Sequence, residues 1–165
     1  MKKRLLGITA IMFFLIAGCS YADDVIWDFL NYDVIFAVAD NSGNDLLNPE
    51  TGGNILEKEI TVEYQGKIFK RAEADTRLNV PMPLGLRMYY YEPAQATVLS
   101  FGEFSPTKNY KGESFTINWG DGTKDIIKFD LYITWRRHDP TVHKIIYLNN
   151  KQYSNESFLI KIVKK

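Results

Sequence analysis

The sequence predicts an all-β protein that folds as an antiparallel β-sandwich after a cleaved signal peptide. Aromatic residues make up 14% of the chain, and aromatic and β-branched residues favour strands. Short apolar stretches, several with alternating polarity, are separated by clusters of Gly, Asn, Asp and Pro. No stretch has the 3.6-residue periodicity of an amphipathic helix. About eight or nine strands at this spacing are typical of a two-sheet sandwich.

The amino terminus has the pattern of a signal peptide. Basic residues at 2–4 precede an apolar run at 5–17, which is shorter than the roughly 20 residues that a membrane-spanning helix needs. The sequence Ile16-Ala17-Gly18-Cys19 then resembles the bacterial lipobox. This resemblance implies cleavage between Gly18 and Cys19 and acylation of Cys19, and two or more acyl chains give a durable membrane anchor. The alternatives are an ordinary secretory signal and an uncleaved anchor.

Three regions follow from this prediction. Residues 1–18 are the signal peptide, residues 19–32 are a lipidated tether, and residues 33–165 are one sandwich domain. The end of the tether, at 25–32, either stays extended or adds an edge strand that docks Trp27. Since Cys19 is the only cysteine, the domain has no disulfide and depends on its core alone.

The residues after Cys19 bear on location. Ser20 stands where an Asp commonly retains Gram-negative lipoproteins in the inner membrane, which favours an outer-membrane anchor. Asp23 and Asp24 resemble the loose export signal of Bacteroidota surface lipoproteins, or they belong to a solvated tether. Loss of the basic residues at 2–4 leaves 17 basic against 20 acidic residues, and no basic patch indicates nucleic acid as a partner.

The first half of the domain shows a regular succession of strands and turns. A nearly continuous apolar strand at 33–39 ends in a polar turn at 40–45. Gln65-Gly66 predicts a two-residue hairpin turn, because Gly supplies a positive φ. The expected strands of this half are residues 33–39, 60–64, 67–70, 84–91 and 97–104. Pro81 and Pro83 predict an irregular stretch at 72–83.

The second half continues the same pattern. Strands at 114–119 and 124–135 are joined by Gly120-Asp121-Gly122-Thr123, and from Ile127 the second strand alternates, which predicts one buried face. Loops are expected at 105–113 and at 136–143, which contain Pro106 and Pro140. The chain then gives a strand at 144–148, a turn at 149–151 and a closing strand at 157–163.

Patches of the sequence are similar to a known group of proteins. The run at 40–49 is similar to a segment early in many small Bacteroidota lipoproteins. The run at 118–123 resembles the Trp-x-Gly-Asp-Gly turn of PKD-type immunoglobulin-like domains, and similar turns, like the hairpin at 147–150, recur in those lipoproteins. The resemblance implies an immunoglobulin-like sandwich in the cell envelope, and it carries no activity and no cofactor.

Three groups of polar residues are candidate metal sites. Asp121 and Asp125 have cation-ligand chemistry, but a tight turn in which Asp121 accepts bonds from nearby amides is the preferred interpretation. The turn at 40–45 is acidic enough for calcium, yet its Gly precedes the last two acidic or amide residues and does not fit the EF-hand register. His138 and His143 lack the further ligands that zinc needs. The prediction is no metal and no cofactor.

The exposed aromatic residues are the candidate ligand contacts. In the run Tyr89-Tyr90-Tyr91, strand alternation turns Tyr90 to the face opposite its neighbours. Trp135 stands at the end of a long strand, next to Arg136. Tyr90, Trp135 and Arg136 are therefore the candidate contacts for a glycan or a protein of the envelope. The alternatives are that the rings are covered or pack on long side chains and that Arg136 belongs to a solvated loop.

The preferred function is a lipid-anchored, non-enzymatic binding or structural module. Its partners are the membrane, through the lipid on Cys19, and a glycan or envelope protein. One alternative is an accessory protein or enzyme of surface glycan processing, which needs two carboxylates about 5–10 Å apart across a cleft. Another is an adhesin or pilus-type subunit, which needs an open sheet groove. No Gly-x-Ser-x-Gly motif indicates a serine hydrolase.

Overall fold

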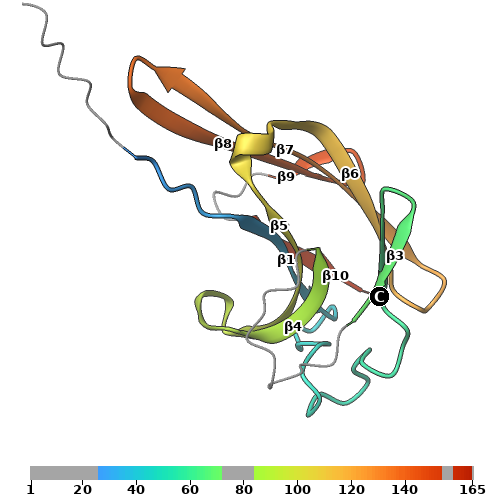
Figure 1. Cartoon of the computed structure of the whole chain (residues 1–165). Coiled ribbons are helices and arrows are strands. Elements are labelled where there is room, and N and C mark those ends of the chain that lie inside the picture. Colours follow the sequence, from blue (N-terminus) through green and yellow to red (C-terminus); the bar gives the residue numbers. More distant parts are fainter. Residues whose placement is uncertain (1–25, 72–83, 154–157, 165) are drawn as a thin grey trace, which may run out of the picture.

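The chain folds as two β-sheets packed face to face, which confirms the predicted all-β sandwich (Figure 1). The computed structural model describes residues 26–71, 84–153 and 158–164. The predicted signal peptide, Gly18 and Cys19 lie outside the described residues, as does the stretch expected to be irregular at 72–83. No helix among the described residues is long and apolar enough to cross a membrane.

The smaller sheet has the strand order β10-β1-β5-β4. Its strands are β1 (Tyr32–Ala39), β4 (Gly85–Tyr91), β5 (Ala96–Phe104) and β10 (Leu159–Val163). β5 pairs antiparallel with both β1 and β4. β10 pairs with β1 in parallel, which differs from the purely antiparallel sandwich that the sequence predicts.

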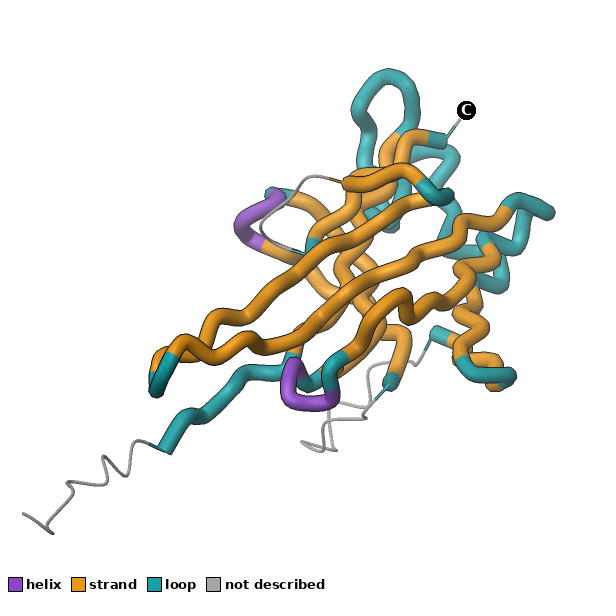
Figure 2. Tube along the Cα trace, turned by 90° about the horizontal axis from the view of Figure 1, so that it is seen from above, coloured by secondary structure: helices purple, strands orange, loops and turns teal. Residues whose placement is uncertain are grey.

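The larger sheet has the order β3-β2-β6-β7-β8-β9, with every neighbouring pair antiparallel. Its strands are β2 (Thr61–Tyr64), β3 (Lys67–Lys70), β6 (Tyr110–Asn118), β7 (Lys124–Arg136), β8 (Asp139–Leu148) and β9 (Lys151–Tyr153). The short 3-10 helices η1 (Glu92–Ala94) and η2 (Pro106–Lys108) lie in the connections on either side of β5. Figure 2 shows the long β7–β8 hairpin running the length of the molecule.

The core lies between the sheets and is rich in aromatic rings. Alternation along β1 turns Val34, Phe36 and Val38 inward, and all three are buried. From the other sheet, β6 and β7 contribute Phe115 and Phe129. Rings from the two sheets meet directly, since the centroids of Phe104 and Phe129 are 4.6 Å apart. Burial of each such ring stabilises the fold by roughly 1.5–3 kcal/mol.

Two expected loops prove to be strand in part. β6 begins at Tyr110, within the predicted loop at 105–113, and its pairing with β7 shifts register between Tyr110 and Glu113. β8 begins at Asp139, within the predicted loop at 136–143. Pro140 is tolerated there because β9 pairs only with Ile146–Leu148, so this end of β8 has a free edge among the described strands.

The segment before β1 follows the first of its two predicted alternatives and adds no edge strand among the described residues. Residues 26–31 form no strand, and Trp27 is 43% exposed instead of docked. Phe29 is the residue that docks, since its ring meets Trp135 edge-on with the centroids 6.1 Å apart. Residues 26–31 therefore contact the sandwich through an aromatic pair and not through a strand.

Candidate functional site

The tip of the β7–β8 hairpin carries two of the three predicted contact residues. Pairing continues to the pair Arg136 and Asp139, so Arg137 and His138 make the turn. Arg137 has a φ of 59°, in the left-handed region. Figures 1 and 2 both show this hairpin extending beyond the rest of the sandwich. The residues at its tip are consequently accessible.

Trp135 lies on the core-facing side of β7 but past the end of the core. By alternation it shares a face with Phe129 and Leu131, which are fully buried, yet Trp135 is 54% exposed. Phe29 covers one edge of its ring. Arg136 points to the other face and is exposed. Trp135 and Arg136 are thus both exposed, and both belong to one hairpin.

Tyr90 lies elsewhere. It is 55% exposed on β4, in the other sheet. The rings of Tyr89 and Tyr91 contact each other at 6.2 Å, which confirms that the run alternates and that Tyr90 faces away from them. Figure 1 shows β4 and the hairpin tip in different layers of the sandwich. The three predicted contact residues therefore do not form one site.

On the outward face of the same hairpin, side chains of β7 and β8 pack against one another and against Lys111 of β6. The rings of Tyr132 and His143 stack with centroids 4.7 Å apart, and Thr134 Oγ1 lies 2.7 Å from His143 Nε2. Lys111 Nζ lies 4.9 Å from the centre of the Tyr132 ring. His143 is thus part of a strand, not of the solvated loop that the sequence predicts.

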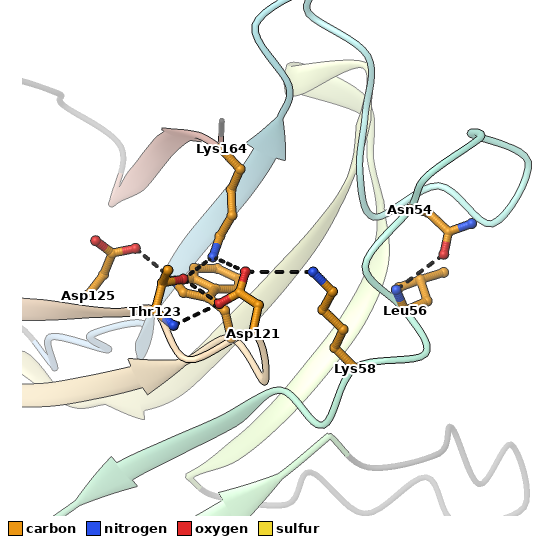
Figure 3. Close-up of polar contacts among 8 residues, drawn as sticks. Asn54, Leu56, Lys58, Asp121, Thr123, Asp125 and Lys164 are labelled. Carbon is orange, nitrogen blue, oxygen red and sulfur yellow. Dashed lines mark hydrogen bonds and ion pairs between the residues drawn. The ribbon is translucent and has the colours of Figure 1, made fainter.

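The Gly120-Asp121-Gly122-Thr123 sequence is the predicted structural turn (Figure 3). Gly120 and Gly122 have φ of 72° and 85°, and the Asp121 carboxylate accepts bonds from the amide and hydroxyl of Thr123. Lys164 Nζ donates to the same carboxylate at 3.0 Å, and Lys58 Nζ lies 3.7 Å away. The bond from the Thr123 hydroxyl, followed by the bond from the Thr123 amide and then by Lys164, holds the pKa of Asp121 well below its usual range.

Asp125, the other acidic residue of this candidate cation site, is also engaged. The indole of the buried Trp119 donates to one carboxylate oxygen at 2.7 Å, and the Asn149 amide donates to the other at 2.6 Å. Lys164 Nζ lies 4.7 Å from the centre of the Trp119 ring. Sequence reasoning missed Lys164, because nothing near residue 164 signals a contact with residues 119–123.

The acidic turn at 40–45 is likewise held by its own backbone. Asp40 accepts bonds from the amides of Ser42 and Asn44 and from the Asn44 side chain, and the side-chain bond from Asn44 leads in lowering the pKa of Asp40. Asp45 accepts from the Thr97 amide at 2.7 Å, which ties this turn to β5. Within the described ranges, no three His, Cys, Asp or Glu side chains are grouped as a metal would need.

Two carboxylates do come together on the smaller sheet. Arg87 donates to Asp33 at 2.9 Å and to Glu103 at 3.0 Å. Glu103 has a φ of 90°, at the point where the β1–β5 register shifts, so the arginine stabilises a bulge. These acids contact one guanidinium and do not face each other across a cleft, as glycoside hydrolysis requires.

A shallow pocket of about 270 Å³ lies at one end of this sheet, between β1, β10 and the η1 turn. Small side chains such as Ala37, Ala39 and Ala96 line it, with Lys161 at its margin. Its volume is below the range of about 300–1,000 Å³ that is usual for small-molecule sites. Asp45, Gln95 and Lys161 are the polar residues of its lining.

Comparison with known proteins gives no match to a family model, to a curated protein or to a solved structure. The fold and the described contacts define the chain as an all-β sandwich with an exposed aromatic hairpin tip.

Proposed function

We propose that this chain is a lipid-anchored protein of the cell envelope, whose sandwich is a non-enzymatic binding or structural module. The observation that carries the proposal is the lipobox-like Ile16-Ala17-Gly18-Cys19 after an apolar run. Acylated Cys19 becomes the first mature residue, and two or more acyl chains hold the protein on the membrane. The outer membrane is the proposed location, since Ser20 follows the cysteine.

The arrangement of the chain supports a tether after Cys19. The packed core draws its residues from β1 onward, and residues 26–31 lie outside both sheets. Residues 26–31 therefore take no part in sheet pairing, which leaves them free to connect the domain to a lipid on Cys19. Among the predicted contact residues, the one that we propose for an envelope glycan or protein is Tyr90, which is 55% exposed on β4.

The lipid anchor has a direct test. We expect mass spectrometry of the mature protein to find an acylated Cys19 as the first residue, and membrane fractionation to place the protein in the pellet. Cys19→Ser should abolish both, because serine cannot form the thioether. Ser20→Ala, which alters the next residue and leaves the thiol, is the matched control and should stay in the pellet. Membrane retention of Cys19→Ser would refute the anchor.

The side of the membrane is a separate question with its own measurement. A surface protein is cleaved when protease is added to intact cells, whereas a periplasmic protein is cleaved only after the outer membrane is opened. The acidic pair Asp23 and Asp24 leads us to expect cleavage on intact cells. Replacement of both by Asn should then give a protein that is protected until the cells are opened.

A further inference from the structure

We propose that the exposed apolar residues at one end of the molecule rest in the headgroup region of the membrane that holds the lipid. The surface comprises Ile26, Trp27, Leu30 and Trp135 and is called the apolar tip here. The inference rests on the proposed lipid anchor at Cys19 and adds to it a defined orientation of the domain on the bilayer.

The exposure of these side chains is the first argument. Ile26 is 93% exposed and Leu30 is 76% exposed, the two highest values among large hydrophobic residues of the described chain. Trp27 and Trp135 are 43% and 54% exposed. Gathered apolar surface of this kind marks an interaction site on soluble proteins, whereas single exposed residues such as Ile68 need no explanation.

One contact joins the two segments that carry these residues. The edge-on packing of Phe29 against Trp135 ties the amino-terminal segment to the hairpin and contributes about 1 kcal/mol. Figures 1 and 2 both show residues 26–31 running alongside the β7–β8 hairpin toward its tip. The carboxyl terminus and the turns at 65–66 and 120–123 lie away from this end (Figure 1). A surface that residues 26–31 contact therefore also lies close to the hairpin tip.

The length of the tether identifies the membrane as the occupant. Residues 20–25 separate Cys19 from Ile26, so even a fully extended chain places Ile26 within about 25 Å of the lipidated residue. The anchor therefore keeps the tip next to the bilayer at all times. Tryptophan suits this position, because its ring is apolar while its indole N–H reaches water or headgroups.

The charges of the tip set the lipid preference. Arg136, Arg137 and Asp139 are exposed at or beside the turn, and Asp28 is exposed in the segment before β1, so these two basic and two acidic groups balance. An anionic headgroup therefore gains little from the tip, unlike a polybasic segment, where each Lys or Arg adds about 1 kcal/mol. Contact should depend on the apolar side chains and be nearly independent of anionic lipid and of salt.

Tryptophan fluorescence in vesicles tests the orientation. The full lipidated protein is reconstituted into phosphatidylcholine vesicles in which the acyl chains carry bromine, a short-range quencher. We expect loss of emission from Trp27 and Trp135 and no loss from Trp119, which is fully buried. Variants that keep one tryptophan, with the other two changed to Phe, assign the signal, and the Trp119-only variant is the matched control. Addition of phosphatidylglycerol should leave the quenching unchanged.

The outcomes separate the two proposals. An acylated protein that pellets with vesicles but shows no quenching of Trp27 or Trp135 retains the anchor and overturns the orientation. An unlipidated Cys19 overturns both, and mass spectrometry of the same sample reveals it. If quenching is absent and Trp135→Ser converts an oligomer to a monomer in detergent, the tip binds a second copy instead, and the membrane contact is wrong.

Discussion

At the scale of single residues, Asp121 connects three parts of the chain. Its carboxylate lies in the β6–β7 turn and contacts Lys58, from the loop before β2, and Lys164, which follows β10. Lys164 also lies over the ring of Trp119, whose indole is bonded to Asp125. Through this turn Lys164, the last described residue, is connected to the buried Trp119, which follows β6 of the larger sheet.

The depressed pKa of Asp121 makes this contribution pH dependent. A carboxylate with a folded pKa below its unfolded value of 3.8 stabilises the fold above pH 4 and loses that effect as pH falls toward the folded pKa. We expect Asp121→Asn to lower the free energy of unfolding by about 1 kcal/mol at pH 7. Urea unfolding should show a smaller difference from wild type at pH 3.

The control for this prediction is Asp28→Asn, since Asp28 is exposed in the amino-terminal segment. It should match wild type at both pH values. A deficit of Asp121→Asn that is equal at pH 7 and pH 3 would mean that lost geometry, and not lost charge, causes the effect.

At the scale of elements, β10 completes the smaller sheet and the core together. Its parallel pairing covers the edge of β1, and the Ile35 amide donates to the Phe158 carbonyl at 2.7 Å just before the strand begins. Phe158 packs against Tyr32 in its own sheet and against Phe129 in the other. The strand is therefore a structural part of the sandwich and not an appended tail.

Truncation of the Phe158 side chain tests the structural role of β10. The side chain is 4% exposed, and Phe158→Ala should lower the free energy of unfolding by about 3–5 kcal/mol, because it leaves a cavity between the sheets. Val163→Thr, at a 62% exposed position of the same strand, keeps the β-branched shape and should stay within about 0.5 kcal/mol of wild type. Guanidinium unfolding measures both, and similar losses in the two variants would contradict the role assigned to Phe158.

At the scale of the whole molecule, the two sheets share one core. The rings of Phe36 and Phe115 meet at 6.1 Å, and those of Tyr64 and Phe101 at 5.8 Å. In each pair one ring belongs to the smaller sheet and the other to the larger. Neither sheet can lose its partner without exposing these rings to water, so the described sandwich is one cooperative unit.

One transition is the expected result of unfolding. The far-ultraviolet circular dichroism signal follows the strands of both sheets, and Trp119 fluorescence follows the core of the larger one. The midpoints of the two signals should coincide, as two-state unfolding requires. Separate midpoints would show that the sheets unfold independently.

The sequence predicts the strands better than it predicts their limits. Alternation from Ile127 correctly predicts the buried face of β7, and Gln65-Gly66 correctly predicts a hairpin, with φ of 49° and 72°. The error at 105–113 arises because a register shift accommodates residues that look like breakers. The error at 136–143 arises because Pro140 is a breaker only where a neighbouring strand needs its N–H.

The candidate site is predictable only in part, for a related reason. Exposure of Trp135 and Arg136 follows from their place at the end of a strand next to a polar turn. The contacts of Phe29 with Trp135 and of Lys164 with Asp121 join residues far apart in the chain. The sequence around each residue gives no indication of such distant pairs. The same holds for Tyr90, since its sequence does not reveal which sheet it joins.

The pairing of β10 with β1 has a consequence for how the protein is made. Leu159 and Ile35 are partners across almost the whole length of the described chain, so the contact order is high and loop closure must precede the gain from pairing. A nascent chain that still lacks residues 158–163 has β1 with a bare edge and a core without Phe158, Ile160 and Ile162. Folding of the sandwich is therefore completed only after residues 158–163 have emerged from the ribosome.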